Sequence, residues 1–172
     1  VSGNTYAWST NETTDSITVS AAGTYTVQGT IVAKSTRGFI VGDGTGYVYY
    51  YNTSYDQSAY AIGDMVKLAG SVVAYGGVFE FNNSTTVTAA TSSNYVEEEP
   101  TVITGTQMDA RVASTTPTQL SSYVQYEGTL TVSGSYYNIT NIEGATTAKG
   151  SISYPTDTEF TGLNGKQVKV KK

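Results

Sequence analysis

The sequence contains no cysteine and no histidine among its 172 residues. Without these residues the chain cannot form a Ser-His-Asp triad, a cysteine nucleophile, a histidine-ligated haem or an ordinary zinc site. Carboxylate pairs, oxygen-ligated calcium and lysine chemistry remain open, but no carboxylate pair stands out for acid–base catalysis. We therefore expect a protein that is not an enzyme and that has no cofactor and no metal centre.

Charged residues are also scarce, at 13% of the chain, and the formal net charge is −5. No segment carries the strong basic excess that a phosphate-binding surface needs, so nucleic acid is not an expected partner. No apolar run approaches the ~20 residues that cross a bilayer, so no transmembrane segment is expected. The acidic run Glu97-Glu98-Glu99 is best explained as part of a solvated linker.

What the chain has instead is 18 glycines, 15 tyrosines and only 3 prolines, with abundant serine, threonine and asparagine. This composition is typical of an all-β chain with many turns. Low charge with many tyrosine and threonine residues is also typical of exposed and secreted material. We therefore expect an exported protein that is extracellular or on the outer surface of a cell.

Strand signals follow one another at short intervals. Alternating apolar and β-branched residues predict strands at 5–10, 16–20, 24–34, 38–41, 47–52, 65–75 and 78–83. Asp43-Gly44-Thr45-Gly46 predicts a hairpin turn rather than a calcium loop or a phosphate-binding loop, and Gly76-Gly77 predicts a second tight turn. The expected organisation is an N-terminal β-hairpin at 1–23, a first domain at 24–93, an acidic linker at 94–100 and a second domain at 101–172.

The second half of the chain repeats the first at an offset of about 100 residues. Gly29 corresponds to Gly128 within a long first strand, where a glycine permits a bulge or a sharp bend. The matching segments are 27–34 with 125–132, 40–46 with 139–145, and 62–68 with 164–170. One arrangement of strands has therefore been used twice.

A bent first strand, a tight hairpin and a later glycine-containing strand suit a small five-stranded barrel, the OB-fold. Residues 25–83 resemble the OB-fold modules of exported proteins and lipoproteins in some Gram-negative bacteria, through TVQGTIVAKSTRGFIVGDGTGYVYYY and IGDMVKLAGSVVAYGGVFEF. Residues 6–27 separately resemble the last strands of immunoglobulin-like repeats of bacterial surface proteins. We therefore expect an all-β chain of two tandem OB-like five-stranded barrels preceded by a β-hairpin. The same resemblance makes Ser16, in Asp15-Ser16-Ile17, a candidate O-glycosylation site.

A ladder of tyrosines occupies the strand that follows the Asp43 turn. Strand alternation places Tyr47, Tyr49 and Tyr51 on one face, partly exposed, with Arg37 and Tyr75 as candidate neighbours. Aromatic side chains on this strand of an OB-fold can stack on sugars or bases. The other two interpretations are a protein–protein contact, where tyrosine is enriched, and a solvated sheet with good cross-strand packing.

The second barrel lacks a counterpart of the strand at 78–83. If the chain ends near Lys172, the last strand has an open edge and an incompletely covered apolar side at Val168 and Val170. We expect residues 5–20 of another copy to complete residues 124–172, with Tyr6, Trp8, Ile17 and Val19 at the contact. An apolar strand following Lys172 would close the barrel instead.

Two functions follow from these expectations. The first is a non-catalytic structural or adhesive subunit of an extracellular or cell-surface assembly, with copies of itself or other surface proteins as partners. Strand donation that repeats head-to-tail would make this assembly a filament. The alternative is an OB-type module that binds a polysaccharide or single-stranded nucleic acid. The lysines at 166, 169, 171 and 172 would either protect an edge strand or dock an acidic neighbour.

Overall fold

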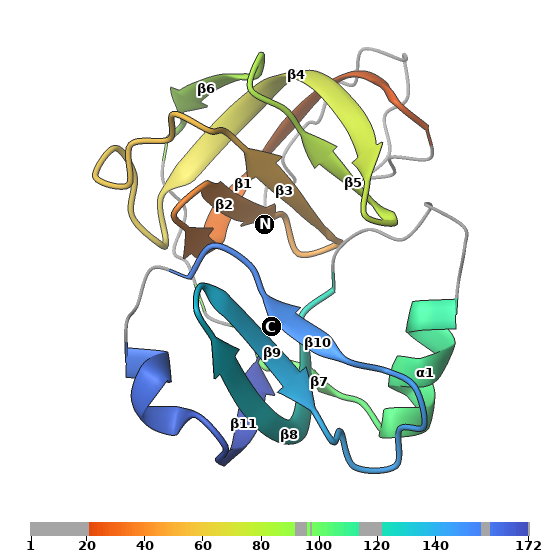
Figure 1. Cartoon of the computed structure of the whole chain (residues 1–172). Helices are drawn as coiled ribbons and strands as arrows, with labels where there is room; N and C mark the ends of the chain where they lie inside the picture. Colours follow the sequence, from red (N-terminus) through yellow and green to blue (C-terminus); the bar gives the residue numbers. More distant parts are fainter. Residues whose placement is uncertain (1–20, 92–95, 97, 114–121, 156–158, 172) are drawn as a thin grey trace. The chain divides into compact units, whose positions relative to one another are not determined.

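A computed structural model describes residues 21–91, 96, 98–113, 122–155 and 159–171 of the chain. The predicted N-terminal hairpin, with the candidate residues Tyr6, Trp8, Ser16, Ile17 and Val19, lies outside the described residues. The chain divides into two compact units, one of residues 1–97 with 116–121 and one of residues 98–115 with 122–172. Each unit is built around its own curved sheet (Figure 1).

Strands dominate both units, so the all-β prediction is confirmed. The first unit contains β1 (Gly23–Ser35), β2 (Gly38–Gly42), β3 (Tyr47–Tyr51), β4 (Met65–Tyr75), β5 (Val78–Phe81) and β6 (Thr86–Ala89). The second contains β7 (Thr101–Val102), α1 (Gly105–Ala113), β8 (Val124–Ser133), β9 (Tyr136–Thr140), β10 (Gly150–Ile152), the 3₁₀ helix η1 (Glu159–Leu163) and β11 (Gln167–Lys171).

The first unit is a closed five-stranded barrel with an OB-like arrangement. Its strands follow the order β1-β2-β3-β5-β4, and β4 pairs again with β1 to close the ring. All neighbours are antiparallel except β3 and β5, which run parallel. The first strand is long enough to pair with β4 over its first half and with β2 over its second half. β6 lies outside the ring and extends β4 on its free edge.

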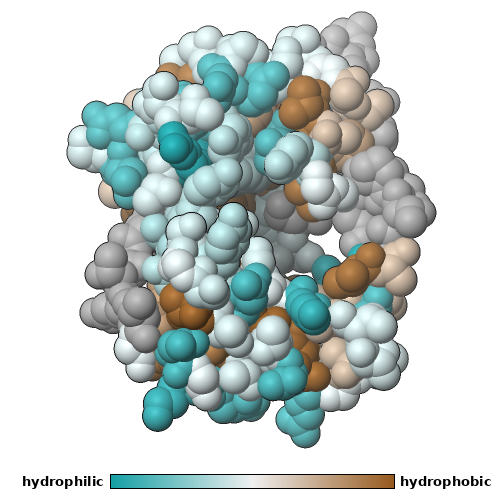
Figure 2. All heavy atoms as spheres, viewed as in Figure 1, coloured by the Kyte–Doolittle hydropathy of each residue, from teal (hydrophilic) through white to brown (hydrophobic). Residues whose placement is uncertain are grey.

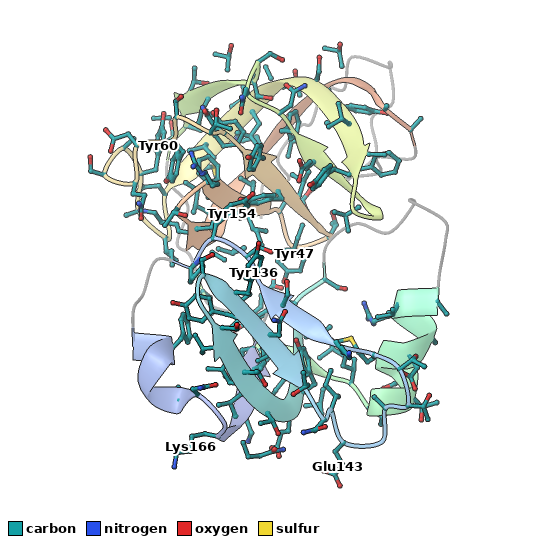
Figure 3. All side chains as sticks on the ribbon, viewed as in Figure 1. Tyr47, Tyr60, Tyr136, Glu143, Tyr154 and Lys166 are labelled. Atoms are coloured by element: carbon teal, nitrogen blue, oxygen red, sulfur yellow. The ribbon has the colours of Figure 1, made fainter. Side chains whose placement is uncertain are left out.

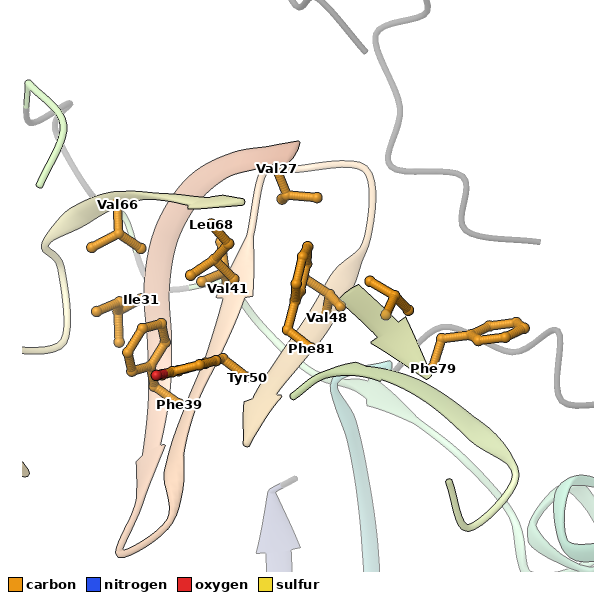
Figure 4. Close-up of a cluster of buried hydrophobic side chains, with 11 residues drawn as sticks. Val27, Ile31, Phe39, Val41, Val48, Tyr50, Val66, Leu68, Phe79 and Phe81 are labelled. Carbon is orange, nitrogen blue, oxygen red and sulfur yellow. The ribbon is translucent and has the colours of Figure 1, made fainter. Parts of the chain in front are cut away.

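Alternating side chains of these strands fill the barrel. Ile31, Phe39, Val41, Val48 and Phe81 are fully buried, and Figure 4 shows how they converge from different strands. The remaining core members are Val27, Tyr50, Val66, Leu68, Val72 and Phe79. Gly29 lies close to β2, because an added Cβ would come within 2.5 Å of the Gly42 carbonyl oxygen. A glycine is therefore required at this position, two residues before the register of β1 with β2 shifts between Ile31 and Ala33.

The second unit is a curled, open sheet in the order β10-β9-β8-β11, with β7 pairing in parallel with β8. Its core is smaller and consists of Ile103, Val124, Tyr126, Leu130, Ile139 and Ile142. The short helix α1 contributes Met108 to the side of this core, and η1 contributes Phe160.

Matching backbone contacts in the two units support the predicted repeat. Gly29 pairs with Val66 on β4, and Gly128 pairs with Val168 on β11. The Ile31 N–H donates to the Asp64 carbonyl over 2.8 Å, and the corresponding Leu130 N–H donates to the Lys166 carbonyl over 2.9 Å. β1, β2, β3 and β4 therefore correspond to β8, β9, β10 and β11.

The helix α1 was not expected, because the second domain at 101–172 was predicted as an all-β barrel and no element was assigned to this region. Thr104 and Gln107 form a capping box at its start, because the Gln107 N–H donates to Thr104 Oγ1 and the Thr104 N–H donates to Gln107 Oε1, over 3.2 and 2.8 Å. This reciprocal arrangement stabilises the first turn of a helix. β6 also lies in a segment where no strand was predicted.

Candidate binding surfaces

The tyrosine ladder lies on the outer face of the first barrel. Tyr47, Tyr49 and Tyr51 are partly exposed, while Val48 and Tyr50 between them are buried in the core. This confirms the prediction that the three rings share one face of a strand. The rings of Tyr49 and Tyr51 are neighbours, with centroids 6.4 Å apart and planes inclined at 55°. Their role as ligand or protein contacts stays a prediction.

Neighbouring strands hold these rings in place. The Tyr49 hydroxyl lies 2.9 Å from Ser35 Oγ, which also accepts the Arg37 N–H over 3.1 Å. Tyr47, labelled in Figure 3 at the start of β3, covers Gly42 so closely that an added Cβ would come within 2.9 Å of the ring. Because Gly42 has no side chain on the outer face of β2, the Tyr47 ring can pack directly against this strand.

The other two residues predicted for this site take different positions. Arg37 lies in the turn between β1 and β2, and its guanidinium donates a hydrogen bond to the Thr53 carbonyl. Tyr75 lies at the last residue of β4 and is 71% exposed. Alternation from Val73 puts Tyr75 on the outer face of the barrel. The Arg37 side chain thus binds a neighbouring backbone carbonyl, whereas the Tyr75 side chain is exposed to solvent at the end of the hairpin.

A buried carboxylate lies beside the tyrosine ladder. Glu80 is the middle residue of Phe79-Glu80-Phe81, whose two phenylalanines point into the core. Glu80 pairs with Tyr49 on β3 and with Val73 on β4, so it belongs to the outer face. Its side chain is nevertheless only 9% exposed, and this burial raises the pKa of its carboxyl group. Sequence reasoning missed Glu80, because an alternating strand predicts an outward glutamate in water.

The turn at residues 43–46, which precedes the tyrosine ladder, is closed by its own hydrogen bonds and is a hairpin turn, as the sequence predicted. Asp43 Oδ1 accepts hydrogen bonds from the Thr45 N–H, the Thr45 hydroxyl and the Gly46 N–H, over 2.8, 2.7 and 3.1 Å. Such an aspartate closes its own turn. The hairpin interpretation of this segment is confirmed by the antiparallel pairing of β2 with β3.

The second candidate surface is the outer edge of β11 in the second unit. On one side β11 pairs with β8 over its whole length. In the first barrel the corresponding part of β4 has a second partner, since Val66 to Ala69 pair with β6. Among the described residues of the second unit, no strand occupies the position that β6 takes beside β4. β11 is therefore an edge strand in this part of the chain.

Hydrogen-bond alternation shows which backbone groups face that open edge. Leu130 is bonded to Lys166, and bonded pairs alternate along an antiparallel ladder. Val168 and Val170 therefore direct their backbone groups to β8, while Gln167, Lys169 and Lys171 direct theirs outward. In the first barrel the Met65 carbonyl, the counterpart of Gln167, accepts the Ala90 N–H over 2.8 Å.

The side chains of β11 separate by polarity. Val168 and Val170, predicted as inter-subunit contacts, are half-buried and pack against the core of their own unit. Lys169 lies 3.8 Å from Glu127, and Lys171 lies 3.6 Å from Glu99. Both ion pairs are exposed, so they contribute little to stability. The lysines and valines thus lie on opposite faces, as predicted.

A single aspartate fastens α1 to the connection between β9 and β10. The Asp109 carboxylate accepts five hydrogen bonds, from the N–H and hydroxyl groups of Thr146 and Thr147 and from the Ala148 N–H, over 2.7 to 3.1 Å. These bonds hold the pKa of Asp109 well below its usual range. The cluster is a structural clamp, and no spacing in the sequence pointed to it.

On the face shown in Figure 2, strongly hydrophobic residues are scattered among weakly polar ones. Within the described residues, no group of three or more acidic side chains is placed to hold a metal ion. The one α-helix among those residues is too short to cross a membrane. Comparisons with models of protein families, with curated proteins and with solved structures give no match to this chain.

Proposed function

We propose that this chain is a non-catalytic structural subunit of an assembly on the outer surface of a bacterial cell. Copies join when a strand of one subunit pairs with the open edge of β11 in another. The observation that carries this proposal is the difference between the two units: β4 has β6 on its second edge, whereas β11 has no corresponding partner among the described residues. The low charge and many tyrosines of the chain support an exposed location.

An open strand edge favours association. Outward N–H and carbonyl groups form a ready template for another strand, and main-chain hydrogen bonds supply the affinity in such β-augmentation. Val168 and Val170 lie on the core side of β11 and are only half-buried, so an added strand would also gain apolar contact. Backbone hydrogen bonding and apolar burial therefore both favour the addition of a strand to the open edge of β11.

The N-terminal segment offers a sequence that fits this edge. In the first unit the strand beside β4 reads Thr-Val-Thr-Ala at 86–89, and its Val87 packs against the core opposite Leu68. Residues 18–21 read Thr-Val-Ser-Ala. Placed in the same register on β11, this segment sets Val19 opposite Val170, the counterpart of Leu68. Donation of this kind is head-to-tail and builds a filament or a ring.

The test uses a proline at an outward position of β11. Lys169→Pro removes an N–H that faces the open edge, whereas Lys169→Thr removes the same charge and keeps the N–H. Light scattering over about 10 µM to about 1 mM protein should show concentration-dependent growth for the parent and for Lys169→Thr, but not for Lys169→Pro. A parent chain that is monomeric throughout, or a proline variant that assembles equally well, contradicts the proposal.

A second variant tests the donor. Deletion of residues 1–20 removes the Thr-Val-Ser sequence, so assembly should be lost while the first barrel remains folded by circular dichroism. A synthetic peptide of residues 14–22 added in excess should then bind the truncated chain. Assembly that survives the deletion assigns the donor strand elsewhere and overturns this part of the proposal.

A further inference from the structure

The carboxylate of Glu80 is buried on the outside of the barrel, in surroundings that do not compensate its charge. The pairing registers of five strands place it in a cross-strand row of Val73, Glu80, Tyr49, Ile40 and Ala33. Apolar and aromatic side chains thus flank the carboxylate on both sides. Burying a carboxylate without a hydrogen-bond donor or a counter-ion is unfavourable.

The first barrel has three cations, and none of them is paired with Glu80. Lys67 is an exposed residue of β4 that lies opposite Gln28 and Thr88, and the other two bind backbone carbonyls. Lys34 Nζ donates to the carbonyls of Gln57 and Tyr60, over 2.6 and 2.5 Å. Arg37 donates to the Thr53 carbonyl. Among the described residues the Glu80 carboxylate has neither an ion pair nor a hydrogen bond. Both ion pairs of those residues lie in the second unit.

The tyrosine ladder supplies the second half of a cation site. The electron-rich faces of aromatic rings attract cations, and a planar guanidinium can stack on a ring while it binds a carboxylate through two N–H groups. Tyr49 lies directly beside Glu80, and Tyr51 contacts Tyr49 along the same strand. The Ser35 contact fixes the Tyr49 hydroxyl, so its ring is held beside the carboxylate.

We propose that Glu80, Tyr49 and Tyr51 form a binding site for an arginine side chain presented by a partner protein. A guanidinium would neutralise the carboxylate and replace the hydrogen bonds that it lost on burial, whereas a neutral sugar hydroxyl would leave the charge uncompensated. Arginine fits better than lysine, because guanidinium is more weakly hydrated and stacks on aromatic faces. The site lies in the first barrel and is independent of the strand addition proposed for β11.

The experiment titrates the isotope-labelled chain with three short peptides and follows its amide signals by NMR. The peptides are N-acetylated, C-amidated Gly-Arg-Gly, Gly-Lys-Gly and Gly-citrulline-Gly, of which the last has nearly the shape of arginine without its charge. We expect the arginine peptide to shift the signals of Tyr49 and Glu80 most, the lysine peptide less, and the citrulline peptide negligibly. Binding should weaken as sodium chloride rises from about 0.05 M to about 0.5 M.

Substitutions of Glu80 and Tyr51 test whether these two side chains bind the arginine peptide. Glu80→Gln should weaken the arginine peptide about ten-fold or more, and Tyr51→Ala should weaken it several-fold. The matched control is Glu127→Gln, which removes an exposed carboxylate of the second unit and should change nothing. The Glu80 carboxyl carbon signal should also titrate at lower pH when the peptide is bound, which a merely structural role would not produce.

Two results would overturn the proposal. One is equal binding of the citrulline and arginine peptides, or full binding to Glu80→Gln, because charge pairing is then absent. The other is an oligosaccharide that shifts the Tyr49 and Glu80 signals where the arginine peptide does not. That outcome would assign the tyrosine ladder to a neutral polymer.

Discussion

Gly29→Ala is expected to lower the free energy of unfolding of the first barrel by about 3 kcal/mol, at the upper end of the range for overpacking a core. The added Cβ would come within 2.5 Å of the Gly42 carbonyl oxygen and within 2.7 Å of Val41 Cγ1. The nearer atom is backbone that belongs to a paired strand, so it cannot move away without breaking the β1–β2 ladder. Relief therefore requires distortion of the barrel.

The corresponding change in the second unit should cost less. At Gly128 the nearest atom to an added Cβ is Ile139 Cγ2 at 2.6 Å, and the nearest backbone atom is the Thr140 carbonyl oxygen at 2.9 Å. A side-chain methyl can rotate or shift, and the sheet of this unit is open. We therefore expect about 1–2 kcal/mol for Gly128→Ala.

Urea unfolding followed by hydrogen exchange mass spectrometry reports on the two units separately and provides the assay. Gly162→Ala is the control, because an added Cβ there meets nothing within 4 Å, and it should change the free energy of unfolding by less than about 0.5 kcal/mol. Unchanged urea midpoints for both Gly29→Ala and Gly128→Ala would refute the close approach of the strands and the repeat alignment together.

Three further predictions concern polar groups. Thr104→Ala removes the acceptor of the Gln107 N–H and should destabilise the second unit by about 1 kcal/mol in urea unfolding. The pKa of Asp109 is lowered in the folded state, so its stabilisation is present above its ordinary pKa of 3.8 and is lost as the pH falls below that value. Asp109→Asn should therefore lower the melting temperature of the second unit near neutral pH and flatten its acid dependence; a parallel pH profile would contradict this. The pKa of Glu80 is raised above 4.5, so the ionised carboxylate costs stability as the pH rises through the folded-state value. Glu80→Gln should stabilise the first barrel at neutral pH, with a gain that disappears in acid, and a destabilised variant would be the opposite result.

Much of the fold could be predicted because its strands alternate cleanly. The pattern at 47–51 places tyrosine outward and Val48 and Tyr50 inward, as the burial of these residues confirms. The turn at Gly76-Gly77 was predictable for a physical reason, since both residues adopt positive φ angles of 58° and 86°. Local chemistry was sufficient for these elements.

The helix α1 was missed although its signal is present in the sequence. Thr104 followed three residues later by Gln107 is a capping-box pattern, but the segment after it has a weak apolar stripe and few buried residues. β6 was missed because Thr86 to Ala89 form a short, mostly exposed strand. Both elements depend on contacts with a sheet more than on their own apolar pattern.

The buried polar groups could not be predicted from spacing. Asp109 binds residues that lie 37 to 39 positions further along the chain. Glu80 is buried by neighbours on β3 and β4, and only the pairing registers show which side chains those are. Polar sites of this kind arise when distant segments meet, so they require the tertiary arrangement.

Residue-specific amide exchange of β11, measured by NMR at low and high protein concentration, tests the proposed assembly most directly. Gln167, Lys169 and Lys171 direct their N–H groups to the open edge, whereas Val168 and Val170 bond to β8. We predict that the exchange of the first three slows as the concentration rises from about 10 µM to about 1 mM, while that of the two valines is slow throughout. Fast and concentration-independent exchange at all three outward positions would contradict strand addition at this edge.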